Sequence, residues 1–157
     1  MIEVNSKLPS VTFSYFKDGE MVNATTEDLF AGKKVVMFAV PGAFTPTCSE
    51  AHLPGYVVNY DKFKDKGVDE VICLSVNDAF VMDAWGKSQN AENIIMLADG
   101  GAEFVTETGL GFETGGFGGT RSQRFAMVVE DGVVTLLNVE KPKEFEVSSA
   151  EHVLTQL

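Results

Sequence analysis

Residues 35–48 read VVMFAVPGAFTPTC, and this stretch decides the fold class. Its first six residues are a continuous apolar run, which is typical of a central strand buried on both faces. The run ends at Pro41. From Cys48 to Lys66 apolar residues recur at steps of three and four, which predicts a helix with a kink at Pro54. A buried strand that leads through a short loop into a helix is typical of an α/β sheet.

The flanking sequence continues this alternation. Two further apolar runs predict buried strands at 71–76 and 94–97, and Asp78 is placed to cap a helix over 79–85. A helical turn is expected over 102–108, followed by a flexible glycine-rich loop over 109–119. These elements predict a sheet with helices on both faces.

Both ends of the chain add hairpins and short helices. Alternation around Asp18-Gly19 predicts a hairpin over 11–25, and the segment 26–30 offers a hydroxyl cap for a short helix, with Thr26 at its start. A second hairpin is expected around 130–132, and a last helix over 149–157 with Ser148 or Ser149 as its cap. The predicted class is α/β with a thioredoxin-like fold: a central mixed β-sheet flanked by helices, with an N-terminal β-hairpin.

Composition limits the functions to consider. At 157 residues, with 45% hydrophobic and 22% charged residues, residues 1–157 are expected to form a single domain. The net charge is 12 − 23 = −11, which argues against nucleic acid or an anionic membrane as partners. The opening MIEVNSKLPS does not resemble a secretory signal, and no apolar run approaches the roughly 20 residues of a membrane span. We therefore expect a cytoplasmic protein.

Cys48 is the strongest candidate for chemistry. It follows a proline-bounded loop at the carboxyl end of a predicted strand and begins a predicted helix, where N–H groups and the helix dipole favour a thiolate, the nucleophilic form. Thr45 lies three residues earlier, so its hydroxyl can turn towards the sulfur or towards a bound oxygen. Pro41 and Pro46 hold the loop extended. The pattern predicts a reactive cysteine.

The remaining candidates carry weaker signals. Cys73 lies between Ile72 and Leu74 in a predicted central strand, where a buried structural thiol is expected, and the pair of cysteines does not form a CxxC motif. Arg121 and Arg124 are the only arginines, so one of them is the candidate for a local anion site. His52 and His152 lack ligand-spaced companions, and Gly115–Gly119 misses the spacing of a nucleotide loop. No metal or cofactor is expected.

A family resemblance sharpens this interpretation. The run PGAFTPTCS at 41–49 matches the peroxiredoxin active-site pattern of proline, three residues, threonine, proline, any residue and cysteine. Segments 52–55, 73–81 and 124–129 are also similar to the type-five peroxiredoxin class, so the resemblance covers nearly the full chain.

The resemblance implies a thiol peroxidase. It implies that Cys48 is the peroxidatic cysteine, that Thr45 hydrogen-bonds the peroxide and the sulfur, that Pro41 shields the pocket, and that Arg124 stabilises the thiolate and the charge of the breaking O–O bond. Arg121 is then expected to be solvated or to anchor a loop. Implied substrates are hydrogen peroxide and small alkyl hydroperoxides, reduced by Cys48 through a sulfenic acid that excess peroxide can overoxidise. A homodimer is also implied.

One departure from the class concerns recycling. Many members have a second, resolving cysteine near the C-terminus, but residues 146–150 contain none. The chain thus resembles the one-cysteine form and the peroxidase half of bacterial fusions with glutaredoxin. We expect glutathione with glutaredoxin as the external reductant, with thioredoxin as the alternative and Cys73 as a less favoured resolving partner. The rival functions are a general thiol-disulfide oxidoreductase and a peroxide sensor or holdase switched by Cys48 oxidation.

Overall fold

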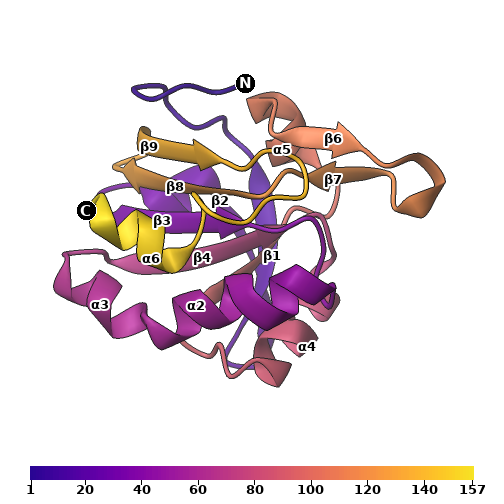
Figure 1. The fold of residues 1–157 in the computed structure, drawn as a ribbon, viewed down its shortest axis with the longest axis horizontal. Coiled ribbons are helices and arrows are strands. Elements are labelled where there is room, and N and C mark those ends of the chain that lie inside the picture. The colour runs from indigo at the N-terminus through magenta and orange to yellow at the C-terminus, as the bar shows by residue number, and fades with distance from the viewer.

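A seven-stranded mixed sheet forms the centre of the computed structural model, which describes residues 1–157 (Figure 1). The strand order is β2-β1-β5-β4-β3-β8-β9, in which β3, β4 and β5 run parallel and the other neighbours are antiparallel. The strands are β1 (Thr12–Lys17), β2 (Glu20–Thr25), β3 (Lys34–Ala39), β4 (Glu70–Ser75), β5 (Ile95–Ala98), β8 (Phe125–Glu130) and β9 (Val133–Val139). The predicted thioredoxin-like sheet is confirmed.

Helices cover both faces of this sheet and create two apolar cores. They are α1 (Thr26–Phe30), a π-helical turn (Cys48–His52), α2 (Leu53–Val58), α3 (Tyr60–Asp65), α4 (Ala79–Ser88), α5 (Glu103–Thr108) and α6 (Ala150–Thr155). One core lies under α2, α3, α4 and α6, and the other under α1 and α5. Burial on both faces explains the continuous apolar runs of β3 and β4. None of the helices is long and apolar enough to span a membrane.

Both predicted hairpins have tight two-residue turns. Lys17 pairs with Glu20 across Asp18-Gly19, and Glu130 pairs with Val133 across Asp131-Gly132. The four turn residues have φ values from 48° to 81°, the left-handed region that Asp and Gly tolerate. Local turn chemistry therefore sets the register next to both turns; in the β8–β9 pair the register then shifts between Val128 and Val129.

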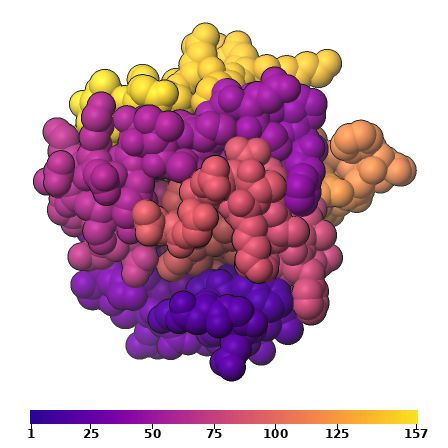
Figure 2. All heavy atoms as spheres, turned by 90° about the horizontal axis from the view of Figure 1, so that it is seen from below, coloured from indigo at the N-terminus to yellow at the C-terminus, as the bar shows by residue number.

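The prediction of a flexible loop over 109–119 is wrong. Strand β6 (Gly111–Glu113) pairs with β7 (Thr120–Ser122) in a separate two-stranded sheet. The turn between them is fastened by the Thr114 N–H and hydroxyl, which both donate to the Gly119 carbonyl. Gly115 and Gly119 have φ values of 60° and 65°, which glycine adopts without steric cost, so these glycines form an ordered turn. This hairpin projects from the body of the molecule (Figures 1 and 2).

Two details of the predicted helices also need correction. The α1 cap is Thr25, one residue earlier than expected, because the Thr26 hydroxyl is used to donate to the Pro9 carbonyl. The segment 48–66 is not one helix kinked at Pro54: this proline lies in the first turn of α2, where its missing N–H costs little, and the break falls at Asn59. Ser149 caps α6, as one of the two predicted alternatives.

Candidate active site

The Cys48 loop leaves the carboxyl end of β3, beside the parallel strand β4. The Ser49 N–H donates to the Thr45 carbonyl over 2.9 Å, so the first helical turn begins at Pro46, a position where proline is favoured. This turn places Cys48 where the sequence predicted it, at the start of a helix and outside the ends of parallel strands, the usual ligand-binding edge of such sheets.

The turn that follows is wider than an α-helical turn. The Leu53 N–H donates to the Cys48 carbonyl, five residues back, which defines a π-helical turn over Cys48–His52. Pro54 comes next and has no N–H to continue the α-helical pattern. Both Cys48 and His52 are fully buried, so this turn directs the two side chains inward together.

Two donors contact the Cys48 sulfur. The Thr45 hydroxyl lies 2.9 Å from Sγ, and Nη2 of Arg124 lies 3.1 Å from it. The Thr45 oxygen is also 2.7 Å from the Gly42 carbonyl, so its single hydrogen can be donated to either acceptor. A hydroxyl and a guanidinium on a buried sulfur stabilise negative charge there.

Arg124 is the arginine at this site, and His52 holds it. Its Nη1 lies 2.8 Å from His52 Nδ1, and its guanidinium carbon lies 5.9 Å from the centre of the Phe145 ring. His52 Nε2 is 3.1 Å from the Ser148 carbonyl, which only accepts, so Nε2 carries the hydrogen and Nδ1 accepts from Arg124. The imidazole is therefore a fixed acceptor for the guanidinium.

His52 stays neutral in this environment. Burial lowers the pKa of His52 from 6.5 to about 3, the nearby Arg124 charge acts in the same direction, and the bond to Ser148 opposes them. Its ring packs between Phe38 and Phe145, with centroid distances of 4.9 and 5.0 Å. Sequence reasoning missed this residue; its position four residues after Cys48, on the same side of a helix, was the available signal.

A buried carboxylate fixes the segment behind His52. Glu140 accepts from the Ser148 hydroxyl and N–H and from the Glu146 N–H at 2.6 to 2.9 Å. Burial raises the pKa of Glu140, but these hydrogen bonds outweigh it and the net shift is downward. The Tyr56 hydroxyl also donates to the Ser148 carbonyl, over 2.7 Å. Contacts thus run from Glu140 through Ser148 and His52 to Arg124 and the sulfur.

Arg121 has a different role. Its Nε donates to the Gly118 carbonyl over 2.9 Å and its Nη1 to the Val76 carbonyl over 3.1 Å, so it ties the β6–β7 turn to the end of β4. A Cβ added at Gly118 would lie 2.6 Å from that Nε, so a side chain at this position would force the Arg121 guanidinium to move. The expectation that Arg121 anchors a loop is confirmed.

Asn77 is a second residue that sequence reasoning missed. Its side-chain oxygen accepts from the Ala43 N–H over 3.0 Å and from the Ser75 hydroxyl over 2.6 Å. These bonds attach the Cys48 loop to the end of β4. No local motif marks Asn77, because the contact joins segments 34 residues apart.

Cys73 is a buried thiol on β4, between β3 and β5. Burial raises the pKa of Cys73 well above its ordinary value; Cys48 adds to this and Arg124 opposes it. A thiol that keeps its proton is a poor nucleophile, so the structural expectation for Cys73 fits the geometry.

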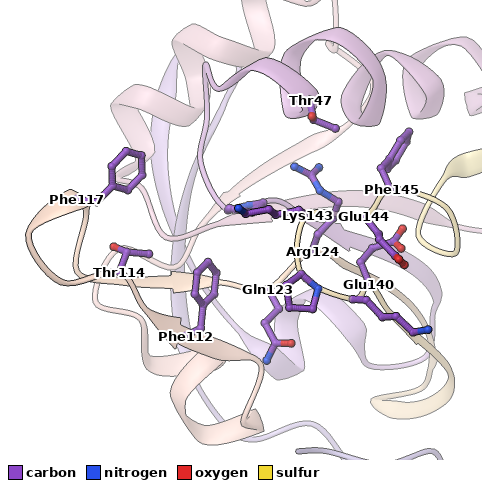
Figure 3. Close-up of a pocket in the computed structure, with 13 residues that line it drawn as sticks. Thr47, Phe112, Thr114, Phe117, Gln123, Arg124, Glu140, Lys143, Glu144 and Phe145 are labelled. Atoms are coloured by element: carbon purple, nitrogen blue, oxygen red, sulfur yellow. The ribbon is translucent and has the colours of Figure 1, made fainter.

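A pocket of about 740 Å³ opens beside the sulfur site (Figure 3). Arg124 belongs to its wall and at the same time contacts Cys48, while Pro41 and Thr47 line the wall on the Cys48 loop. The other lining residues are Phe112, Thr114, Phe117, Gln123, Glu140, Lys141, Pro142, Lys143, Glu144 and Phe145. Phe44 and Phe80 are absent from this lining, and their side chains are 57% and 66% exposed.

Comparison with known proteins agrees with this geometry. Residues 3–154 match the model of the Redoxin family. Peroxiredoxin-2B of Arabidopsis thaliana is 46% identical over 99% of this chain and 98% of its own length. The hybrid peroxiredoxin hyPrx5 of Haemophilus influenzae is 45% identical, over 96% of this chain and 64% of its own length. Reduced Prx3 of Vibrio vulnificus, solved in complex with hydrogen peroxide, is 60% identical over 99% of both chains, with a TM-score of 0.97.

The fold and the buried, hydrogen-bonded cysteine define a thiol peroxidase. The chain belongs to the Redoxin family, and its relatives are peroxiredoxins, including type-five-like members.

Proposed function

We propose that Cys48 is the peroxidatic cysteine. Its thiolate attacks the terminal oxygen of a hydroperoxide; the S–O bond forms as the O–O bond breaks, and the departing alkoxide or hydroxide takes up a proton. The products are Cys48 sulfenic acid and an alcohol or water. The observation that carries this proposal is the buried Cys48 sulfur with hydroxyl and guanidinium donors at 2.9 and 3.1 Å.

The neighbouring residues have distinct roles in this reaction. Arg124 stabilises the thiolate and the charge on the breaking O–O bond, and Thr45 donates to the sulfur or to the bound peroxide. Pro41 shields one wall of the pocket. His52 acts as a positioning residue, since it holds Nη1 of Arg124 and leaves Nη2 directed at the sulfur. A donor held in place before the reaction costs no reorganisation during it.

An external thiol is proposed to recycle the sulfenic acid. Glutathione attacks the sulfenic sulfur to give a mixed disulfide and water, and a glutaredoxin thiol or second glutathione then releases the Cys48 thiol. Support comes from the burial of Cys73 in β4 and from the lack of cysteine over 140–157. The chain matches 64% of the length of the hybrid peroxiredoxin hyPrx5, which fits its resemblance to the peroxidase half of a fusion protein. Thioredoxin is the alternative reductant.

A homodimer and a cytoplasmic location complete the proposal. Phe44 on the Cys48 loop and Phe80 on α4 offer exposed apolar surface, which suits contact with a second copy. Two free cysteines fit a reducing compartment. Sedimentation at micromolar concentration tests the dimer, and Phe80→Glu is expected to shift it towards monomer.

Peroxide consumption by three proteins tests the reductant and the one-cysteine mechanism. Wild type, Cys48→Ser and Cys73→Ser are compared with glutathione plus glutaredoxin, and separately with thioredoxin and its reductase. Loss only in Cys48→Ser, with turnover on glutathione, is expected. Equal loss in Cys73→Ser, with native stability, would make Cys73 the resolving partner. One oxidation event without turnover on either reductant would favour a sensor.

A further inference from the structure

The pocket beside the sulfur is far larger than hydrogen peroxide requires. About 740 Å³ is in the range of sites for drug-sized ligands, whereas a water-sized molecule takes about 30 Å³. Its walls include the aromatic rings of Phe112, Phe117 and Phe145, and the Phe117 side chain is 87% exposed. An exposed aromatic ring at a catalytic pocket suits an apolar ligand better than water. The pocket therefore has room for an organic chain.

The same pocket carries positive charge in an acidic protein. Arg124, Lys141 and Lys143 line it, against the carboxylates of Glu140 and Glu144, whereas the whole chain has a net charge of −11. The carboxylate of Glu140 is occupied by its bonds to the 146–148 backbone and Ser148. Glu140 keeps its negative charge, so the charged residues of the lining sum to 3 − 2 = +1, a small positive excess in an acidic chain.

Lys143 is one of the two lysines in this lining, together with Lys141. Its backbone is in the left-handed region, with φ 68°, which is unusual for a residue with a long side chain. Its ammonium makes no ion pair, because the one ion pair of the chain joins Lys87 and Asp83. In Figure 3 the Lys143 side chain lies in the middle of the lining residues, with Phe112 and Phe117 on one side and Phe145 on the other. An unpaired cation among aromatic walls suits an anionic head on an apolar chain.

We propose that Lys143 makes this protein selective for organic hydroperoxides that carry a carboxylate on an apolar chain, such as fatty-acid hydroperoxides. The carboxylate binds the Lys143 ammonium, the chain packs on Phe117 and Phe112, and the peroxide group reaches Cys48 past Arg124. The chemistry is that of the proposed function, on which this inference rests: the S–O bond forms, the O–O bond breaks, and the hydroxy acid leaves after proton uptake.

Single-turnover oxidation of the reduced protein isolates this step from recycling. The probes are hydrogen peroxide, linoleic acid hydroperoxide and the methyl ester of that hydroperoxide, each mixed with wild type, Lys143→Gln, Phe117→Ala and the control Lys66→Gln, at low and high salt. Lys66 is exposed and caps α3, outside the pocket lining. The ester matches the acid in its chain but lacks the charge.

In wild type we expect the acid to react faster than the ester, with the preference shrinking at high salt. Lys143→Gln is expected to lower the rate constant for the acid by about threefold to fivefold, the contribution of one exposed ion pair. The rate constants for the ester and for hydrogen peroxide should stay unchanged. Phe117→Ala slows the acid and the ester alike, and Lys66→Gln changes nothing. Equal rates for acid and ester in wild type, or an unchanged rate constant for the acid in Lys143→Gln, would overturn the proposal. If hydrogen peroxide does not oxidise Cys48 in the wild-type protein, the proposed function itself is refuted.

Discussion

Replacing His52 tests whether the buried imidazole positions Arg124. His52→Leu removes the acceptor that lies 2.8 Å from Nη1 of Arg124, while the Ser148 carbonyl keeps its bond from Tyr56. A hydrogen bond to a charged group contributes about 1.5–3 kcal/mol, and each 1.36 kcal/mol is a tenfold change in rate. We therefore expect the rate constant for Cys48 oxidation to fall by about 10- to 100-fold. Removal of the guanidinium in Arg124→Leu is expected to cost about 100- to 1,000-fold.

The assay separates positioning from general damage. Oxidation by hydrogen peroxide is measured by competition with catalase, alongside the melting temperature of each variant. His52→Gln can offer an oxygen to Arg124 and an amide hydrogen to Ser148, so it should recover most of the rate that His52→Leu loses. The reasoning is refuted if His52→Leu oxidises within twofold of wild type, or if His52→Gln is folded and as slow as His52→Leu.

Three further results are expected. The pKa of His52 is lowered from 6.5 to about 3, so between these pH values the imidazole is protonated in the unfolded state and neutral in the native state. The free energy of unfolding therefore falls as the pH is lowered from 6.5 towards 3, by about 1.36 kcal/mol per pH unit. Denaturant unfolding should show this slope reduced in His52→Gln and retained in the surface control His152→Gln. Thr45→Val should slow Cys48 oxidation by about tenfold or more, and Thr45→Ser should stay within a few-fold of wild type; equal rates would exclude a role for the hydroxyl. Gly118→Ala forces Arg121 to move, so we expect faster protease cleavage in the β6–β7 turn, and an unchanged digestion pattern would contradict the contact.

Features encoded in short segments could be predicted from the sequence. The Asp18-Gly19 and Asp131-Gly132 turns, the buried runs of β3 and β4 and the Asp78 cap each depend on neighbours within a few residues. The same holds for Thr45 beside Cys48, which one helical turn brings together.

Long-range contacts could not be predicted in the same way. Nothing in the sequence states that His52 meets Arg124 72 positions later, or that Ser148 closes the same site from the C-terminal segment. These pairings depend on the order β4-β3-β8 in the sheet, which places the Cys48 turn over the start of β8. The β6–β7 hairpin was missed for another reason, since its glycines satisfy the turn and its strands have only three residues each.

Trapping the product of one oxidation event tests the central claim most directly. Reduced protein is mixed with one equivalent of hydrogen peroxide and a reagent specific for sulfenic acid, and the labelled peptide is identified by mass spectrometry. We predict stoichiometric label on Cys48, the same label in Cys73→Ser and none in Cys48→Ser. Label on Cys73, or peroxide consumption by Cys48→Ser at the wild-type rate, would contradict the assignment of Cys48 as the peroxidatic residue.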